Sequence, residues 1–201
     1  MHKLQVEAAP QAATSLWTPA NIVTLIRICL VPVFVVVLLS PWPQWFHLPD
    51  LAEHSKSLIA AAIFVLISCT DWLDGYLARS RGEVTDFGKF MDPLADKCLV
   101  TAAMLWFVEI GQMPAWALLV VIIREFGVSG LRMVAADKGR VIAAGWSGKV
   151  KTASTMVCIV LMFLPIPAEL NLACVAVIVL TTIYSGVEYF VKNRDVISEI
   201  K

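Results

Sequence analysis

Residues 71–96 read DWLDGYLARSRGEVTDFGKFMDPLAD, and they connect the end of one long apolar block with the start of the next. On a helix, Asp71 and Asp74 share a face because they are three residues apart, and Asp92 and Asp96, four apart, do so as well. The short polar connection between the blocks allows the two helices to run antiparallel. We therefore expect both pairs of aspartates to meet at one end of the two helices, at a membrane surface.

The composition of the whole chain indicates that most of it lies in lipid. The 201 residues are 59% hydrophobic and 16% charged, with a mean hydropathy of +0.77, whereas a soluble domain is about half apolar and about a quarter charged. This excess excludes a disordered chain and argues against a soluble protein with a single core. The formal net charge is zero, so the chain has no overall attraction for nucleic acid.

The apolar residues fall into blocks close to the length of about 20 residues that a helix needs to cross a bilayer. They predict an all-α integral membrane bundle of six transmembrane helices, at about 20–40, 57–79, 88–110, 114–136, 147–165 and 168–190. Turn-forming prolines and glycines separate several of the blocks. We expect residues 1–16 to form a cytoplasmic tail and residues 17–201 to form one membrane domain.

The basic residues predict the orientation of this bundle. With six spans, every Lys and Arg except Lys56 falls on the side that carries both termini, either in a loop or in the nearer half of a span. Segments rich in Lys and Arg remain in the cytoplasm. Both termini are therefore expected to be cytoplasmic, with a polar active-site cavity that faces the cytoplasm.

Four neighbouring carboxylates at a membrane surface need a compensating charge. Each costs up to about 2.5–3.5 kcal/mol near the bilayer core, and the four would also repel one another. Hard divalent cations held by carboxylate oxygens compensate both effects. The alternative is that the aspartates form ordinary interfacial salt bridges with Arg79, Arg81 and Lys89. Two same-face pairs on adjacent helix ends favour the metal site.

The same stretch carries a family signature. The motif DxxDGxxAR at 71–79, followed after eight residues by GxxxDxxxD at 88–96, resembles the signature of the CDP-alcohol phosphotransferase family. The segment 19–27, PANIVTLIR, is similar to the start of that family's first span. With six predicted spans, the resemblance extends over nearly the whole chain.

The resemblance implies an enzyme that transfers a phosphatidyl group from CDP-diacylglycerol to an alcohol and releases CMP. It implies that Asp71, Asp74 and Asp92 hold one or two Mg²⁺ or Mn²⁺ ions. Asp96 would complete the metal site, act as general base on the acceptor hydroxyl, or do both. Arg79 would contact the donor pyrophosphate. The donor-binding residues implied by the resemblance are Asn21, Thr24, Gly75, Ala78, Arg79 and Gly88.

A second set of basic residues predicts a pocket for an acceptor phosphate: Arg124, Arg132, Lys149 and Lys151. The two arginines share a helix face, and intramembrane arginines usually face a cavity or a partner; both arginine and lysine suit phosphate. The alternative is that the lysines are cytoplasmic flanks and that Arg124 pairs with Glu125 or an aspartate. Residues 124–132 and 148–152 resemble the phosphatidylglycerophosphate synthase branch, whose acceptor is sn-glycerol 3-phosphate.

Two other hypotheses remain open. The same chemistry could use another acceptor, such as inositol phosphate, serine or phosphatidylglycerol. A divalent-cation transporter could use the four aspartates as a path, but it would need polar residues that continue to the far side, and the outer halves of the second and third spans are almost wholly apolar. The family precedent also implies a homodimer in the bacterial inner membrane.

Overall fold

The computed structural model describes residues 19–41, 52–81, 86–137, 139–140, 142 and 145–195. Within these ranges, the side chains of 71–81, 86–93 and several residues near the starts of the first two helices lie outside the description. The described ranges contain no strand and six helices: α1 (Pro19–Leu39), α3 (Ala52–Arg81), α4 (Asp86–Glu109), α5 (Ala115–Asp137), α6 (Trp146–Phe163) and α7 (Ala168–Lys192). Each helix covers one of the predicted apolar blocks, which confirms the all-helical fold.

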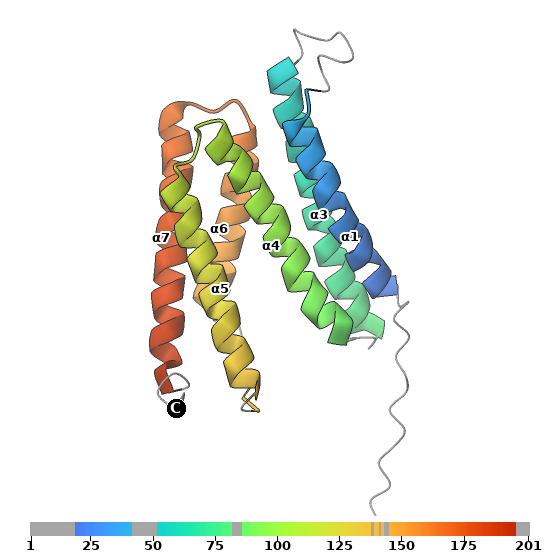
Figure 1. Ribbon diagram of the computed structural model, residues 1–201, viewed down its shortest axis with the longest axis vertical. Coiled ribbons are helices and arrows are strands. Elements are labelled where there is room, and N and C mark those ends of the chain that lie inside the picture. The colour runs from blue at the N-terminus through green and yellow to red at the C-terminus, as the bar shows by residue number, and fades with distance from the viewer. Residues whose placement is uncertain are drawn as a thin grey trace, which may run out of the picture.

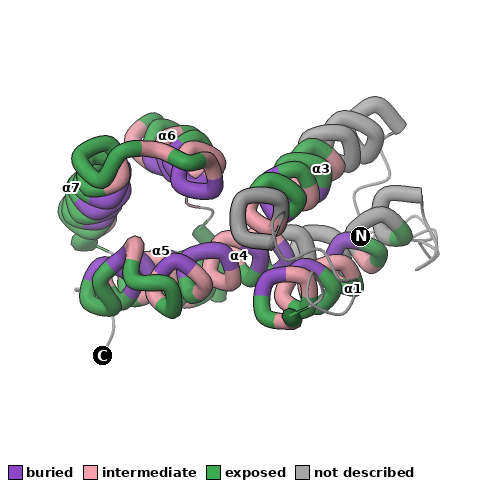
Figure 2. Tube along the Cα trace, turned by 90° about the horizontal axis from the view of Figure 1, so that it is seen from above, coloured by how far each residue is buried: buried purple, intermediate pink, exposed green. Residues whose placement is uncertain are grey.

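The helices form two groups that meet at α4 (Figure 1). In the first group α1 packs on α3 and α4, and in the second α7 packs on α5 and α6. Helix α4 also contacts α5 and α6, and α3 contacts α6, so the two groups form one bundle. Seen along the bundle, α4 lies between α1 and α5 (Figure 2).

Short turns reverse the chain where turn residues predict them. After α4, Gly111 has a φ of +74°, a left-handed conformation that favours glycine. The backbone N–H groups of Gln112 and Met113 then both donate to the carbonyl oxygen of Phe107, at 2.8 and 3.0 Å. Between α6 and α7, Pro165 and Pro167 cannot continue the preceding helix. These turns make α4 and α5, and likewise α6 and α7, antiparallel neighbours.

Four phenylalanines from four helices close one end of the bundle. The ring of Phe163 at the end of α6 lies 6.2 Å from the rings of Phe34 and Phe64 and 4.7 Å from that of Phe107. All four side chains are at most 2% exposed, and tilted or edge-on ring pairs at such separations add to the energy of burial. This aromatic core lies toward the end at which α3 begins, opposite to the connection between α3 and α4.

Removing the Phe163 ring is expected to destabilise the whole bundle. Phe163→Ala leaves a cavity where four helices meet, and such truncations cost about 3–5 kcal/mol. The unfolding temperature of the purified protein in detergent should therefore fall. Phe126→Ala is the control, because this ring on α5 is 76% exposed and its loss should change the unfolding temperature little. Equal shifts in the two variants would contradict a central role for the aromatic core.

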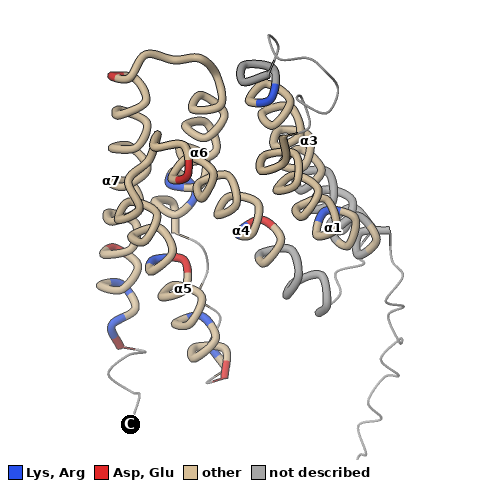
Figure 3. The backbone as a smooth tube through the Cα atoms, turned by 45° about the horizontal axis from the view of Figure 1, so that its top comes forward, with Lys and Arg blue, Asp and Glu red and all other residues tan. Residues whose placement is uncertain are grey.

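Charged residues lie mainly in the middle and at the other end of the bundle (Figure 3). Among the basic side chains that the structure describes, only Lys56, near the start of α3, lies at the phenylalanine end. Charged residues such as Lys97 and Arg124 interrupt the apolar runs of α4 and α5. Of the helices described, α7 alone is long and apolar enough by itself to cross a membrane, and shorter apolar helical stretches cover Leu25–Leu39 and Lys56–Thr70.

Candidate active site

All four predicted metal-binding aspartates lie on helices near the connection between α3 and α4. Helix α3 continues through Asp71 and Asp74 toward its end, and Asp92 and Asp96 lie in the first half of α4. Because the two helices contact each other and run in opposite directions, their backbones place both pairs toward the end of the bundle away from the aromatic core. Asp96 is half-buried there.

The other predicted residues of this region are positioned only by their helices. The side chains of three aspartates and of the donor-binding residues lie outside the described part of the chain: Asp71, Asp74, Asp92, Asn21, Thr24, Gly75, Ala78, Arg79 and Gly88. Asn21 and Thr24 begin α1, which packs on both α3 and α4. The helices therefore bring the predicted donor residues to the same end as the aspartates.

The carboxylate oxygens of the four predicted metal ligands fit a hard divalent cation. Four carboxylates offer only oxygen ligands, which are the ligands that Mg²⁺ and Mn²⁺ prefer. Among the side chains that the structure describes, no group of three His, Cys, Asp or Glu residues could hold a metal. Three of the four predicted ligands are outside that set, so the metal site stays a prediction from the motif and the helix backbones.

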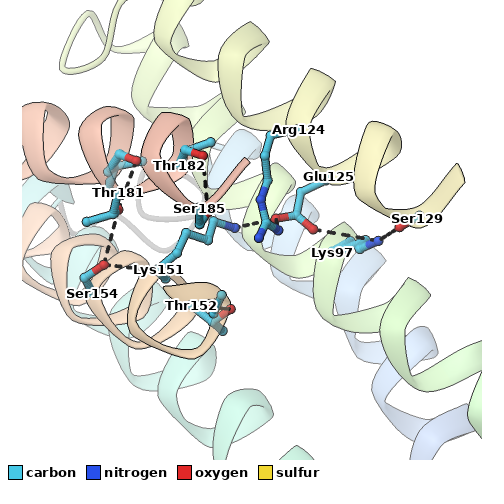
Figure 4. A network of polar contacts seen from close by, with 12 residues as sticks. Lys97, Arg124, Glu125, Ser129, Lys151, Thr152, Ser154, Thr181, Thr182 and Ser185 are labelled. Atoms are coloured by element: carbon cyan, nitrogen blue, oxygen red, sulfur yellow. Dashed lines mark hydrogen bonds and ion pairs between the residues drawn. The ribbon is translucent and has the colours of Figure 1, made fainter. Parts of the chain in front are cut away.

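A cluster of three basic residues around one carboxylate lies between α4, α5 and α6 (Figure 4). Glu125 Oε1 accepts hydrogen bonds from Arg124 Nη1 at 2.9 Å and from Lys151 Nζ at 2.5 Å. Glu125 Oε2 lies 3.7 Å from Lys97 Nζ, and Lys97 also donates to the hydroxyl of Ser129. We call Lys97, Arg124, Glu125 and Lys151 the Glu125 cluster.

The Glu125 cluster is partly buried and carries excess positive charge. Its side-chain exposures are 6% for Lys151, 13% for Arg124, 21% for Glu125 and 35% for Lys97. Three cations and one carboxylate leave a net charge of +2 (3 − 1 = 2). Lys97 directly follows Asp96 on α4, so the cluster and the predicted aspartate site share one helix segment. This arrangement can bind an anion beside the aspartates.

Gly186 makes room for the Arg124 side chain, and Gly148 lies beside its guanidinium group. A Cβ added at Gly186 on α7 would lie 3.2 Å from Arg124 Cγ, and one at Gly148 on α6 would lie 3.6 Å from Arg124 Nη2. The arginine stem thus passes close to the α7 backbone, and its guanidinium reaches the start of α6. The missing side chain at Gly186 therefore allows Arg124 to lie across the junction of α5, α6 and α7.

The four predicted acceptor residues separate into two pairs. Arg124 and Lys151 meet at Glu125. Arg132 is exposed and its Nε donates to the Tyr189 hydroxyl at 3.0 Å, whereas exposed Lys149 lies with its Nζ 5.8 Å from the Trp146 ring centroid. The structure therefore brings one pair together and leaves the other pair outside the Glu125 cluster.

Sequence reasoning did not assign Lys97 to the site. Lys97 lies next to Asp96 in the chain, and this adjacency to the motif was the available signal. The pairing of Arg124 with Glu125 was one of the alternatives, and the structure confirms that contact. The additional contacts of Glu125 with Lys97 and Lys151 make it the shared partner of three cations from three helices.

Comparisons with known proteins agree with the motif. The chain matches a family model described as CDP-alcohol phosphatidyltransferase over residues 17–185. It is 43% identical over 185 residues to a Bacillus subtilis (strain 168) protein named CDP-diacylglycerol–glycerol-3-phosphate 3-phosphatidyltransferase, a match that covers 87% of this chain and 94% of that one. A Pseudomonas fluorescens protein of the same name is 36% identical over 156 residues, covering 74% of this chain and 73% of its own.

A third relative, from Mycobacterium tuberculosis (strain ATCC 25618 / H37Rv), is named "Probable phosphatidylglycerophosphate synthase". It is 38% identical over 182 residues, which cover 88% of this chain and 82% of the relative. The match to the family model spans the motifs at 71–79 and 88–96. The resemblance seen in the sequence is confirmed, and the chain belongs to the CDP-alcohol phosphatidyltransferase family.

Proposed function

We propose that this protein transfers the phosphatidyl group of CDP-diacylglycerol to sn-glycerol 3-phosphate, giving phosphatidylglycerophosphate and CMP. Family membership supports the class of reaction. The names of relatives that are 36% to 43% identical over most of the chain support both substrates. The members of this family are transferases, so the cation-transporter hypothesis loses its support.

In the proposed reaction a hydroxyl oxygen of the acceptor attacks the phosphorus that carries the diacylglycerol group. A new P–O bond forms, the bond from that phosphorus to the bridging oxygen breaks, and CMP leaves with that oxygen. The hydroxyl proton moves to the Asp96 carboxylate, which is half-buried on α4. Such a transfer depends on positioning and charge neutralisation more than on covalent chemistry.

The motif residues supply the donor half of the proposed site. Bound Mg²⁺ or Mn²⁺ would neutralise charge on the donor pyrophosphate, held by Asp71, Asp74, Asp92 and Asp96. Their placement on two contacting helices near one connection supports this assignment. Arg79 would contact the pyrophosphate. Space for the nucleotide would come from the small residues and the start of α1: Asn21, Thr24, Gly75, Ala78 and Gly88.

The observation that favours an acceptor with a phosphate is the excess positive charge of the Glu125 cluster, and the names of the relatives favour glycerol 3-phosphate over inositol phosphate. The cluster's net charge of +2 matches a phosphate monoester, which carries about −1.5 to −2 at pH 7. An acceptor without phosphate, such as serine or inositol, would leave this charge uncompensated. Arg124 and Lys151 are the proposed phosphate contacts, with Lys97 added from the structure. Arg132 and Lys149 remain predicted contacts at the periphery.

We further propose that all six helices span a bacterial inner membrane, with both termini and the polar site on the cytoplasmic side. The concentration of basic residues away from the aromatic core supports this orientation. The apolar character of α7 and of Leu25–Leu39 and Lys56–Thr70 supports burial in lipid. A site near the cytoplasmic surface would let the lipid donor enter laterally with its acyl chains still in the bilayer. A homodimer is expected from the family precedent.

The proposed function is tested by CMP release from CDP-diacylglycerol. Purified protein in detergent with Mg²⁺ should release CMP with glycerol 3-phosphate, and addition of EDTA should stop the release. Inositol phosphate, inositol and serine are the comparison acceptors and should support little release. Release with one of these instead would keep the aspartate site and overturn the assigned acceptor. No release with any acceptor, from folded protein, would contradict the proposed reaction.

A further inference from the structure

We propose that Glu125 is a positioning residue, whose carboxylate holds Lys97, Arg124 and Lys151 at the spacing that receives the acceptor phosphate. In the same role it lowers the combined charge of the three side chains from +3 to +2 (3 − 1 = 2). This inference rests on the proposed function and adds a residue that would act through its neighbours.

The first argument is the way in which Glu125 links three helices. Its two carboxylate oxygens are shared among Lys97 from α4, Arg124 from α5 and Lys151 from α6. Long basic side chains have many rotamers, and ordering them when a ligand binds costs conformational entropy. A carboxylate fixed among them orders the side chains before the ligand arrives, so less entropy is lost on binding. The three cations are therefore preorganised around one point.

The second argument is the mutual repulsion of the cations. Lys151 and Arg124 are 6% and 13% exposed, so water screens their charges only weakly. Without a resident anion, these cations would move apart or the helices carrying them would separate. Glu125 supplies the anion permanently, so the site keeps its shape in the absence of substrate. Its own exposure of 21%, with 35% for Lys97, leaves part of the cluster accessible to a ligand.

The third argument is the charge that remains. A net charge of +2 complements the roughly −2 charge of a phosphate monoester near neutral pH. A charge of +1 would weaken the attraction for a monoester, whereas a charge of +3 would strengthen it only if the three cations kept their positions without the carboxylate that holds them. Glu125 therefore also influences which acceptors bind.

The test measures binding of sn-glycerol 3-phosphate and of inorganic phosphate to the purified protein by isothermal titration calorimetry in detergent. Glu125→Gln keeps the side-chain size but removes the charge, and its Kd for both ligands is expected to rise by about tenfold or more. Glu125→Asp should recover part of the loss. Glu188→Gln is the matched control, because Glu188 is 23% exposed and pairs with a single lysine, Lys192; its Kd should stay unchanged.

A double-variant cycle tests the role of charge separately. In the wild-type background Lys97→Gln lowers the cluster charge to +1 (2 − 1 = 1), and in the Glu125→Gln background it returns the charge from +3 to +2 (3 − 1 = 2). The increase in Kd caused by Lys97→Gln should therefore be several-fold smaller in the second background. Equal effects in both backgrounds would contradict a role for Glu125 in setting the charge.

The outcomes separate this inference from the proposed function. If wild-type protein binds phosphate and Glu125→Gln binds it equally well, Glu125 has only a structural role and the inference fails. If wild-type protein binds neither ligand, the inference also fails. If turnover uses an acceptor other than glycerol 3-phosphate, the proposed function fails, and the phosphate titrations still decide the role of Glu125. Should Glu125→Gln not fold, Glu125→Asp provides the comparison, and a Kd equal to that of wild type for both ligands would contradict the inference.

Discussion

Replacing Asp92 with alanine is expected to abolish CMP release while leaving a folded protein. Asp92 lies in the first half of α4 and is the central aspartate of the motif at 88–96. Loss of an outer-shell partner of a bound metal already costs about 10–100-fold. Loss of a direct ligand should therefore lower turnover by more than about a hundredfold. The measurement is CMP release from CDP-diacylglycerol with glycerol 3-phosphate and Mg²⁺.

Two further variants show whether the loss of turnover comes from the missing carboxylate of Asp92. Asp137→Ala removes an exposed carboxylate at the end of α5 and should keep wild-type turnover. Asp92→Glu keeps a carboxylate at the site, so it should retain more activity than the alanine variant and need more Mg²⁺ for half-maximal rate. Full turnover by Asp92→Ala, in protein that elutes like wild type, would remove Asp92 from the proposed site.

The helices could be predicted because their signals are local. Apolar blocks and the turn residues between them located all six described helices, although the bounds differ at the ends. Helix α3 begins at Ala52, whereas the predicted span begins at 57, and it continues to Arg81. Hydropathy follows the part of a helix suited to lipid, while the backbone hydrogen bonds of a helix continue through polar residues. The difference in bounds is therefore expected for a helix that extends beyond its apolar block.

The site could be predicted only where its residues are close in the chain. The aspartate pairs were visible because three- and four-residue spacings share a helix face. The contact between Glu125 and Lys151 joins residues 26 apart in the sequence, and it depends on how α5 and α6 pack. No local pattern specifies that packing, nor the space that Gly186 leaves beside Arg124. The three-cation arrangement therefore required the structure.

Arg132 shows what a shared helix face specifies and what it leaves open. It follows Arg124 by eight residues on α5, so periodicity placed both in one pocket. Eight residues of helix rise about 12 Å, which separates the two guanidinium groups along the axis even on the same face. In the structure Arg132 accordingly contacts Tyr189 on α7, and Arg124 contacts Glu125. Periodicity specifies a direction from the helix axis, and packing decides which site each side chain joins.

Arg124 is accordingly expected to matter more for acceptor binding than any other basic residue on α5. Arg124→Gln should raise the KM for glycerol 3-phosphate by at least about thirtyfold, because loss of one partner from a desolvated charge pair costs about 2 kcal/mol or more. The KM for CDP-diacylglycerol should change by less than about twofold, since the proposed donor contacts lie on α1, α3 and α4. Steady-state CMP release with each substrate varied in turn measures both constants.

The controls for Arg124 come from neighbouring arginines and from a conservative change. Arg140→Gln removes an exposed guanidinium that pairs with Asp195 at 2.6 Å, and it should leave both KM values unchanged. Arg124→Lys keeps the charge but loses the planar pair of N–H donors that suits phosphate, so its KM for the acceptor should fall between those of wild type and Arg124→Gln. Arg132→Gln should have a smaller effect than Arg124→Gln because Arg132 lies outside the Glu125 cluster.

A different result for Arg124→Gln would contradict the assigned role. If this variant lowers kcat and leaves the KM for glycerol 3-phosphate unchanged, Arg124 makes an interaction only in the transition state. Arg124 would then lie at the transferred phosphate.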